Sequence, residues 1–191
     1  MDTIEKKKNL RDELLERRKA LSEERYRQLS AQIVNSLRTQ PEFREATSVH
    51  CYISMNDRQE VDTHELVRNM LSMGKGVVVP VTNFSEGTLR HFRLHSFGDL
   101  EPNKWGVLEP NEGEEVSPDE LEVVIVPMVG GDEQCNRIGY GKGFYDRFLE
   151  KVSCPKIGLT FDRNVIEEIP VEHFDVPMDK IITDRRVIQC D

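Results

Sequence analysis

The first forty residues alternate leucines with charged residues at a helical spacing. From Glu5 to about Lys19 the apolar positions fall along one stripe, which predicts an amphipathic helix. The leucines of that stripe are Leu10, Leu14, Leu15 and Leu21. Ser22 precedes two glutamates and is expected to cap a second helix that ends near Arg38. Most charges on these two helices are interpreted as a solvated face.

Farther along the chain, short apolar runs alternate with helical patterns. Strands are expected at 49–53, 76–81, 89–94, 123–126, 156–160 and 180–182. Helices are expected at 62–73, with Asp62 as a candidate N-cap, at 144–152 and near 165–168. Residues 89–94 alternate between apolar and polar, which favours an antiparallel neighbour. Glycine and proline break up residues 98–118 too often for long regular structure.

Strands that alternate with helices predict an α/β fold, in which a mostly parallel sheet is covered on both faces. Residues 1–191 contain no repeat, low-complexity tract or linker, so a single domain is expected. Ligands of such sheets bind at the carboxyl ends of the strands. The residues expected there are Ser54, Met55, Glu60, Thr82, Asn83 and Asp162, together with a glycine-rich loop.

The glycine-rich loop places Gly139, Gly141 and Gly143 two residues apart around Lys142. Glycine in a regular element costs about 1 kcal/mol, so this spacing indicates positive φ angles or close approach to a ligand. The loop is expected to connect a strand to the N-terminus of a helix, where free backbone N–H groups suit phosphate. A tight turn without a ligand is the alternative. The cations Arg137 and Lys142, with Asp146 in the first helical turn, favour an anionic ligand and a metal ion.

The composition narrows the class of protein. The chain has 191 residues and a formal net charge of −9, which argues against a nucleic-acid partner. No apolar run approaches the roughly 20 residues that span a bilayer, and no secretory or transit signal is evident, so a cytoplasmic protein without a membrane segment is expected. Cysteines 51, 135, 154 and 190 lack C-x-x-C spacing, which argues against a zinc site and a disulfide framework. Cys135 is interpreted as an incidental loop thiol.

Six segments together resemble the 5-formyltetrahydrofolate cyclo-ligase (methenyltetrahydrofolate synthetase) family over nearly the whole chain. They are K-K-N-L-R at 7–11, I-S-M followed by E-V-D-T between 53 and 63, W-G-V-L-E-P at 105–110, V-P-M-V-G-G-D at 126–132, N-R-I-G-Y-G-K-G-F-Y-D at 136–146 and H-F-D-V-P-M-D at 173–179. The glycine segment is the most specific of them. The loop is not a Walker A motif, since Lys142 is followed by glycine.

The resemblance implies a three-layer α/β fold like that of ribose-5-phosphate isomerase and CoA transferases. It also implies an ATP- and Mg²⁺-dependent ring closure of 5-formyltetrahydrofolate to 5,10-methenyltetrahydrofolate, with release of ADP and phosphate. In this reaction ATP phosphorylates the formyl oxygen, and a ring-forming nitrogen of the folate then displaces phosphate. Such chemistry depends mostly on positioning and charge neutralisation.

The resemblance also implies site residues. ATP would be held by Lys7, Lys8, Asn9, Leu10, Arg11 and the segment Arg137, Ile138, Gly139, Tyr140, Gly141, Lys142, Gly143, Phe144 and Tyr145. The folate would contact Ile53, Met55, Glu60 and Trp105, with Tyr140, Gly141, Lys142, Gly143 and Phe144. Arg137, Lys142 and Tyr145 are the expected catalytic residues. Asp146 and Asp175 are the expected Mg²⁺ ligands, with Asp132, Asp162 and Asp179 as competing carboxylates. A monomer is expected.

Two departures from the family pattern affect the pocket lining. Four residues separate Met55 from Glu60 where many relatives have two, and Phe144 stands where tyrosine is common. Two other functions remain open from sequence. One is a sugar-phosphate isomerase-like enzyme without ATP, which would leave Lys7, Arg11 and Asp146 without a role; the other is a non-catalytic nucleotide- or folate-binding protein on the same fold.

Overall fold

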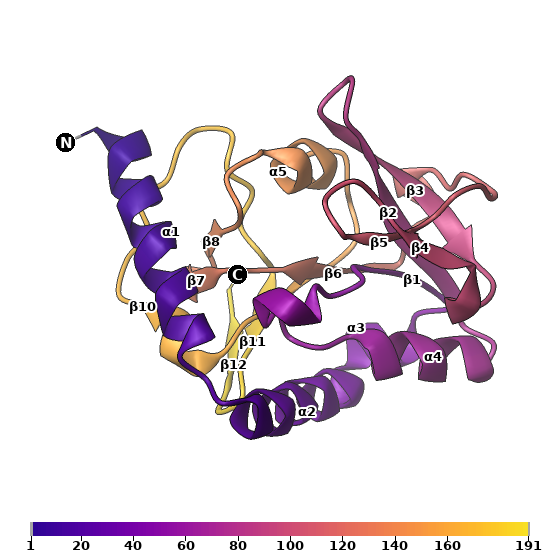
Figure 1. The fold of residues 1–191 in the computed structure, drawn as a ribbon, viewed down its shortest axis with the longest axis horizontal. Coiled ribbons are helices and arrows are strands. Elements are labelled where there is room, and N and C mark those ends of the chain that lie inside the picture. The colour runs from indigo at the N-terminus through magenta and orange to yellow at the C-terminus, as the bar shows by residue number, and fades with distance from the viewer. Residues whose placement is uncertain (1, 191) are drawn as a thin grey trace.

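The structure, a computed structural model, describes residues 2–190 (Figure 1). Its α-helices are α1 (Thr3–Lys19), α2 (Glu23–Thr39), α3 (Pro41–Glu45), α4 (His64–Ser72) and α5 (Phe144–Leu149). The two N-terminal helices are confirmed, and the Ser22 hydroxyl caps α2 by accepting a hydrogen bond from the backbone N–H of Arg25. The N-cap of α4 is Thr63 rather than Asp62, although the Asp62 carboxylate accepts the backbone N–H of His64.

The central sheet has seven strands in the order β12-β11-β9-β6-β1-β2-β3. Their bounds are β1 (Ser48–Cys51), β2 (Gly76–Asn83), β3 (Thr88–Leu94), β6 (Val123–Pro127), β9 (Lys156–Leu159), β11 (Lys180–Ile182) and β12 (Val187–Gln189). The inner strands are parallel, and β3 and β12 close the two edges as antiparallel strands. The expectation of a mostly parallel α/β sheet is confirmed.

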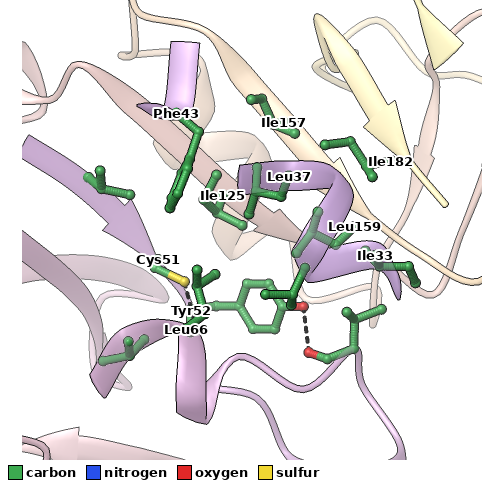
Figure 2. Packing of buried hydrophobic residues seen from close by; sticks show 14 of the residues in the cluster. Ile33, Leu37, Phe43, Cys51, Tyr52, Leu66, Ile125, Ile157, Leu159 and Ile182 are labelled. Carbon is green, nitrogen blue, oxygen red and sulfur yellow. Dashed lines mark hydrogen bonds between the residues drawn. The ribbon is translucent and has the colours of Figure 1, made fainter. Parts of the chain in front are cut away.

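Each face of the sheet has its own apolar core. Along β6, Val123 and Ile125 pack into one core, while Val124 and Val126 pack into the other. Helices α2, α3 and α4 cover the first face and α5 lies on the opposite side (Figure 1). Figure 2 shows side chains of α2, α3 and α4 interleaved with those of β6, β9 and β11 in the first core. Full burial on both faces explains why β6 is an unbroken apolar run.

A small second sheet separates β6 from the glycine-rich loop. It has the order β10-β7-β8, formed by Val165–Ile166, Gly130–Asp132 and Arg137–Ile138. Helix α1 packs against it through Leu14, and a Cβ on Gly130 would lie 2.6 Å from the Leu14 Cδ1 atom. The glycine-rich loop does connect a strand to a helix, as predicted, but that strand is β8 and not β6, because a hairpin too short to read from periodicity intervenes.

Two local predictions are wrong. Residues 165–168 were expected to be helical, but a 3-10 turn at Asp162–Asn164 leads into β10, where two β-branched residues pair with β7. Helix α5 ends at Leu149 rather than near 152. The breaker-rich region 98–118 has no long regular structure, as predicted, and holds only the three-residue strands β4 (Leu100–Pro102) and β5 (Leu108–Pro110).

Cysteine pairing is a further correction. Cys135, in the turn between β7 and β8, forms a disulfide with Cys190, which follows β12. Their Cα atoms are 6.2 Å apart although 55 positions separate them in sequence. The expectation of unpaired, incidental thiols is wrong for these two cysteines, because spacing along the chain does not reveal pairs made by tertiary packing. Cys51 and Cys154 are free thiols.

Two histidines are buried between the sheet and α5. The His50 Nε2 atom on β1 lies 3.1 Å from the His91 Nδ1 atom on β3, and the Phe148 ring packs against both imidazoles. Burial lowers the pKa of His50 well below its usual value, and it lowers the pKa of His91 from 6.5 to about 4. Both rings are therefore neutral in the folded protein near neutral pH.

Candidate active site

A cavity of about 850 Å³ opens at the carboxyl edge of the central sheet. It is bounded by segments that follow β1, by β2, by the end of β6, by α1 and by the glycine-rich loop. Most of the predicted site residues line it: Lys7, Lys8, Arg11, Ile53, Met55, Glu60, Trp105, Asp175 and all of 137–146. Asn9 and Leu10 are not in its lining, and Leu10 packs against the core beneath α1. Ser54, Asn83 and Asp162 also lie outside it.

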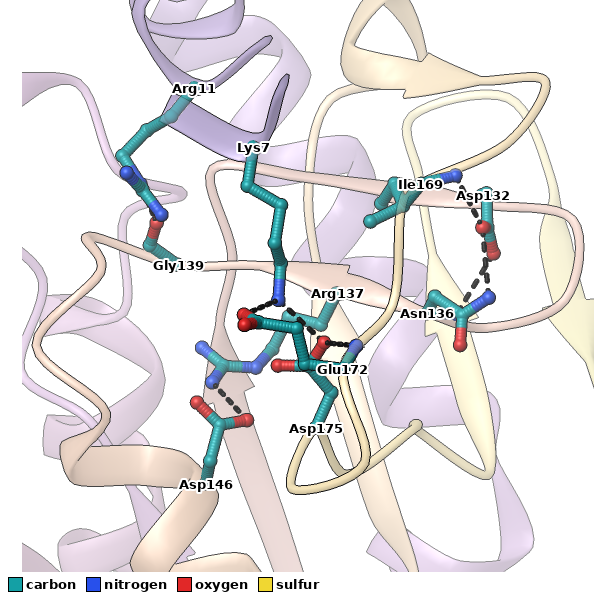
Figure 3. A network of polar contacts seen from close by, with 10 residues as sticks. All are labelled: Lys7, Arg11, Asp132, Asn136, Arg137, Gly139, Asp146, Ile169, Glu172 and Asp175. Atoms are coloured by element: carbon teal, nitrogen blue, oxygen red, sulfur yellow. Dashed lines mark hydrogen bonds and ion pairs between the residues drawn. The ribbon is translucent and has the colours of Figure 1, made fainter. Parts of the chain in front are cut away.

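Helix α1 directs two cations into this cavity. The buried Lys7 Nζ atom lies 2.5 Å from an Asp175 oxygen and 3.2 Å from a Glu172 oxygen. The Arg11 Nε atom donates to the Gly139 carbonyl at 2.7 Å. Figure 3 shows both side chains extending from one face of α1 toward the glycine-rich loop and the 172–175 segment. The resemblance placed these two residues at the site, and both line the cavity; their role in binding ATP stays a prediction.

The glycine-rich loop has the backbone that its spacing predicted at two of three positions. Gly141 and Gly143 have φ angles of 81° and 69°. The positive φ of Gly141 favours glycine, and a Cβ there would lie 2.8 Å from the Arg11 guanidinium carbon and displace that side chain. At Gly139 the φ angle is not positive, but a Cβ would lie 2.5 Å from the Arg137 Nη1 atom. The loop thus lets two guanidinium groups approach the backbone closely.

Arg137 and Asp146 form a further ion pair of the cavity. The Arg137 Nη2 atom lies 3.1 Å from the Asp146 Oδ1 atom, and the Arg137 side chain is 6 % exposed (Figure 3). Its Nε–H has no partner within residues 2–190. The Tyr145 hydroxyl is similarly buried without a partner in that part of the chain. Burial raises the pKa of Tyr145 well above 10, so this hydroxyl remains a neutral donor.

Lys142 differs from the other cations of the cavity. It is exposed, and its ammonium group makes no hydrogen bond or ion pair with any residue that the structure describes. Its carbonyl accepts a hydrogen bond from the Arg147 Nη2 atom at 2.9 Å, and the Arg147 Nε atom also donates to the Gly87 carbonyl. Arg147 thereby fastens the glycine-rich loop to the turn between β2 and β3.

The other end of the cavity is apolar with one buried carboxylate. Ile53 is buried, Met55 is half-buried, and Glu60 is 5 % exposed. The Met55 backbone N–H donates to the Glu60 Oε2 atom at 2.7 Å. Burial raises the pKa of Glu60, while that hydrogen bond, the charges of Arg18 and Arg58, and a hydrogen bond from Tyr140 oppose the rise. The extra residues between Met55 and Glu60 form a 3-10 turn, Asn56–Arg58, and Glu60 still reaches the cavity.

Trp105 stands at the lip of the cavity, as its place in a breaker-rich loop indicated. It is 43 % exposed, its ring centroid lies 4.4 Å from that of Phe84, and Phe144 lies 6.0 Å away. These three aromatic side chains come from the β2–β3 turn, the β4–β5 loop and the start of α5. The Trp105 and Phe84 rings pack edge to face within this aromatic cluster, and Trp105 and Phe144 line the cavity beside the glycine-rich loop.

The carboxylates fit a metal ion that is held mainly by other ligands. Within residues 2–190 no three histidine, cysteine or acidic side chains gather as a metal site. Asp146 and Asp175 both line the cavity, and each is paired with a cation. Mg²⁺ usually takes one or two protein carboxylates and completes its shell with water and phosphate oxygens. The competing carboxylates lie outside the cavity. Asp132 is fully buried and accepts hydrogen bonds from residues 134, 136 and 169. Asp162 forms an ion pair with Arg186, and Asp179 forms one with Lys156.

Sequence reasoning did not identify several residues of the site. Arg58, Arg147, Glu172 and Phe174 line the cavity, and Arg18 lies buried behind it. Phe174 was within reach of sequence reasoning because it belongs to the H-F-D-V-P-M-D segment. Nothing in the local sequence marked the arginines as site residues, because their positions on helices and turns are also typical of charges exposed to solvent.

The cations lining the cavity outnumber its carboxylates, although the whole chain is acidic. In the described part of the chain, no helix is long and apolar enough to cross a membrane. Fold and site together define an α/β protein with a cation-lined cavity at the carboxyl edge of its sheet, suited to a phosphate-bearing small molecule.

The chain belongs to the 5-formyltetrahydrofolate cyclo-ligase family, whose model matches residues 3–184. It is 33 % identical over 178 residues to the 5-formyltetrahydrofolate cyclo-ligase of Escherichia coli K12, covering 90 % of this chain and 97 % of the relative. It is 30 % identical over 190 residues to the mouse enzyme of that name, covering 92 % of each chain.

Solved structures agree with this assignment. The 5,10-methenyltetrahydrofolate synthetase of Aquifex aeolicus superposes with a TM-score of 0.85 at 33 % identity, covering 96 % of this chain and 92 % of the other. A synthetase of the same name from Mycoplasma pneumoniae superposes with a TM-score of 0.76, over 94 % of this chain and 99 % of the other. At 22 % identity, the second match supports the fold alone. The predicted family is confirmed.

Proposed function

We propose that this protein catalyses the ATP-dependent cyclisation of 5-formyltetrahydrofolate to 5,10-methenyltetrahydrofolate, with release of ADP and phosphate. The observation that supports it most directly is the two-ended cavity. Its lining combines Lys7, Arg11 and the glycine-rich loop, which we assign to a phosphate-binding end, with Ile53, Met55 and Glu60, which we assign to an apolar end. A phosphate-binding end and an apolar end with one carboxylate suit a nucleotide and a pterin that must react with each other.

The cationic end is proposed to hold the phosphates of ATP. Lys7 and Arg11 approach from α1, and Arg137 approaches from β8. Gly141 and Gly143 allow the loop backbone to approach the phosphates closely. Lys142, whose exposed ammonium group has no partner among residues 2–190, is the cation best suited to follow the transferred phosphoryl group.

The reaction needs phosphoryl transfer because a formamide oxygen is a poor leaving group. The formyl oxygen attacks the γ-phosphorus, a new P–O bond forms, and the bond between that phosphorus and the bridging oxygen of ADP breaks. The folate nitrogen at position 10 then attacks the activated formyl carbon and gives up its proton to solvent, and the C–O bond breaks to release phosphate. Arg137 and Lys142 are proposed to neutralise the charge that develops on the transferred group, and the buried Tyr145 hydroxyl lies in the same cavity as a neutral donor.

The apolar end is proposed to hold the folate. The Glu60 carboxylate would accept hydrogen bonds from the pterin, with Ile53 and Met55 against its ring. Trp105 and Phe144 would cover the part of the folate that extends toward the cavity lip. Asp146 and Asp175 would hold Mg²⁺, which supplies positive charge to the phosphates when bound.

The test is direct. Purified protein with 5-formyltetrahydrofolate, ATP and Mg²⁺ should give the absorbance of the methenyl product together with one ADP for each product formed. Samples without ATP serve as the control. Absence of both products would refute the proposal, and conversion of a sugar phosphate without ATP would support an isomerase instead.

The monomeric state, the cytoplasmic location and the single-domain organisation of residues 1–191 stay predictions. Size-exclusion chromatography with light scattering tests the first. An apparent mass near 22.1 kDa would support a monomer.

A further inference from the structure

Glu109 is a buried side chain of the cavity lining to which the proposed chemistry gives no role. It belongs to the W-G-V-L-E-P segment at 105–110, lies in β5 and is 8 % exposed. Burying a carboxylate is costly unless hydrogen bonds or an opposite charge compensate. Within residues 2–190 no cation forms an ion pair with Glu109, so hydrogen bonds alone hold it in place.

The two oxygens of Glu109 have different surroundings. The Oε1 atom accepts the backbone N–H of Thr82 at 2.8 Å and the Thr82 hydroxyl at 2.6 Å. No group in the described part of the chain donates to the Oε2 atom, which keeps some exposed surface. Both residues line the cavity. Thr82 therefore fixes one oxygen and leaves the other as an acceptor for a ligand.

The position of Glu109 restricts the part of the ligand that it meets. Thr82 is on β2, which pairs with β1, and the segment after β1 carries Ile53 and Met55 of the apolar end. Earlier in its own segment, Glu109 is preceded by Trp105 at the cavity lip. Glu109 thus stands between the residues assigned to the pterin and those assigned to the part of the folate that extends toward the lip.

The folate nitrogen at position 10 joins these two parts of the molecule. It must lose its proton as the ring closes, because the methenyl bridge leaves this nitrogen without hydrogen. Once its lone pair has formed the new C–N bond, the nitrogen is positively charged and holds its proton weakly, so a carboxylate is a sufficient base. Glu109 would repel phosphate, which argues against a contact with the phosphates of ATP.

We propose that Glu109 is the catalytic base that takes the proton from the folate nitrogen at position 10 during ring closure. This inference rests on the proposed function, in which that nitrogen attacks the phosphorylated formyl group. The nitrogen lone pair forms the bond to the formyl carbon, and the N–H proton passes to a lone pair of the Glu109 Oε2 atom. The C–O bond then breaks, and phosphate leaves with the electron pair. Glu109 finally releases the proton to solvent.

The experiment separates phosphoryl transfer from ring closure in a single turnover. Enzyme in excess is mixed with 5-formyltetrahydrofolate, ATP and Mg²⁺. ADP is measured after rapid quenching, and the methenyl product is followed by its absorbance in a stopped-flow instrument. Glu109→Gln should slow methenyl formation at least about a hundredfold, which is the usual contribution of a general base, and should change the rate of ADP formation less than threefold.

A small carboxylate should replace the missing base. Formate in solution should accelerate methenyl formation by Glu109→Ala, because it can enter the space that the side chain leaves. It should have no effect on the wild type. A residue that only supports the fold would not respond to formate, so this rescue distinguishes a base from a structural carboxylate.

Two further variants serve as controls. Glu101 is exposed and lies opposite Glu109 in the β4–β5 pair, so Glu101→Gln removes the same charge nearby and should leave both rates unchanged. Thr82→Val removes one of the two hydrogen bonds to the Oε1 atom. It should slow methenyl formation about fivefold, the weight of one hydrogen bond, without slowing ADP formation. This variant keeps the proposal testable if the Glu109 variants do not fold.

Three results would contradict this role of Glu109. The first is a methenyl rate near that of the wild type in folded Glu109→Gln. The second is equal slowing of both steps together with no rescue by formate. The third is a loss of ATP affinity alone, measured by calorimetry, which would assign Glu109 to the ribose hydroxyls of ATP. A wild-type protein that forms neither ADP nor the methenyl product would overturn the proposed function, and the role of Glu109 with it.

Discussion

The buried His50–His91 pair predicts that the protein loses stability as the pH falls from about 6.5 to about 4. In the unfolded chain both imidazoles bind protons near pH 6.5. In the folded protein burial lowers both pKa values, that of His91 to about 4, while the Glu115 charge raises it and that of Lys151 lowers it. The unfolded state therefore binds more protons across this window, and the free energy of unfolding falls with falling pH.

The size of the effect follows from the shift of His91. At pH 4.5, a histidine that titrates at 6.5 when unfolded and at about 4 when folded lowers the free energy of unfolding by about 2.5 kcal/mol. At pH 7.5 the same histidine contributes almost nothing. His50 adds to this loss in the same direction, because its pKa is lowered as well. Against a typical domain stability of roughly 5–15 kcal/mol, the change is large.

The assay is urea unfolding followed by circular dichroism at pH 7.5, 6.5, 5.5 and 4.5. The matched control is a variant with leucine at both positions, which removes the titrating pair and leaves no imidazole without its partner. Titrating carboxylates are common to both proteins, so their contribution cancels in the comparison. The wild type should lose at least about 2.5 kcal/mol more than the variant between pH 7.5 and 4.5. Parallel curves would show that the imidazoles are not held neutral in the folded state.

Three further predictions concern the cavity and the disulfide. Lys142→Ala should lower kcat at least a hundredfold while changing the folate dissociation constant less than threefold. Lys19→Ala, which changes another exposed lysine, is the control. Equal losses of kcat and folate affinity would show that Lys142 does not act on the transferred phosphoryl group. Asp146→Asn should raise the Mg²⁺ concentration needed for half-maximal activity about tenfold or more, and an unchanged requirement would place the metal elsewhere. Cys190→Ser should lower the free energy of unfolding by about 4 kcal/mol relative to the oxidised wild type, because the bridge closes a loop of 55 positions in the unfolded chain. The difference should vanish in dithiothreitol. Free thiols at 135 and 190 in mass spectrometry of the oxidised protein would contradict this prediction.

Patterns that repeat along the chain predicted most of the fold. The helices α1 and α2, the buried run of β6 and the alternation of β3 each carry their periodicity over several residues. The strands β7, β8 and β10 have two or three residues each, too few for any period, and their pairing depends on packing against α1. The disulfide between Cys135 and Cys190 was not predicted either, because the two cysteines come together only through the packing of the folded chain.

The sequence predicted those residues of the candidate site that belong to a local motif. It did not predict residues whose position depends on contacts with distant parts of the chain. The glycine spacing indicated positive φ, and Gly141 and Gly143 have it. Arg18 was interpreted as part of a solvated face because a hydrophobic pattern counts every charge as exposed. Its burial depends on Tyr140, which is 122 positions away along the chain. The roles of the residues in catalysis stay predictions until the variants are measured.

The ion pairs Lys7–Asp175 and Arg137–Asp146 have a thermodynamic consequence for ligand binding. In each of these two pairs, a cation proposed for phosphate is already matched with a carboxylate proposed for the metal ion. A nucleotide without metal would take the cations and leave anions facing its phosphates, whereas a metal ion alone would leave the cations unpaired. Nucleotide and metal should therefore raise each other's affinity by the same factor. Through these two pairs, the cavity would favour a metal–nucleotide complex over either component alone.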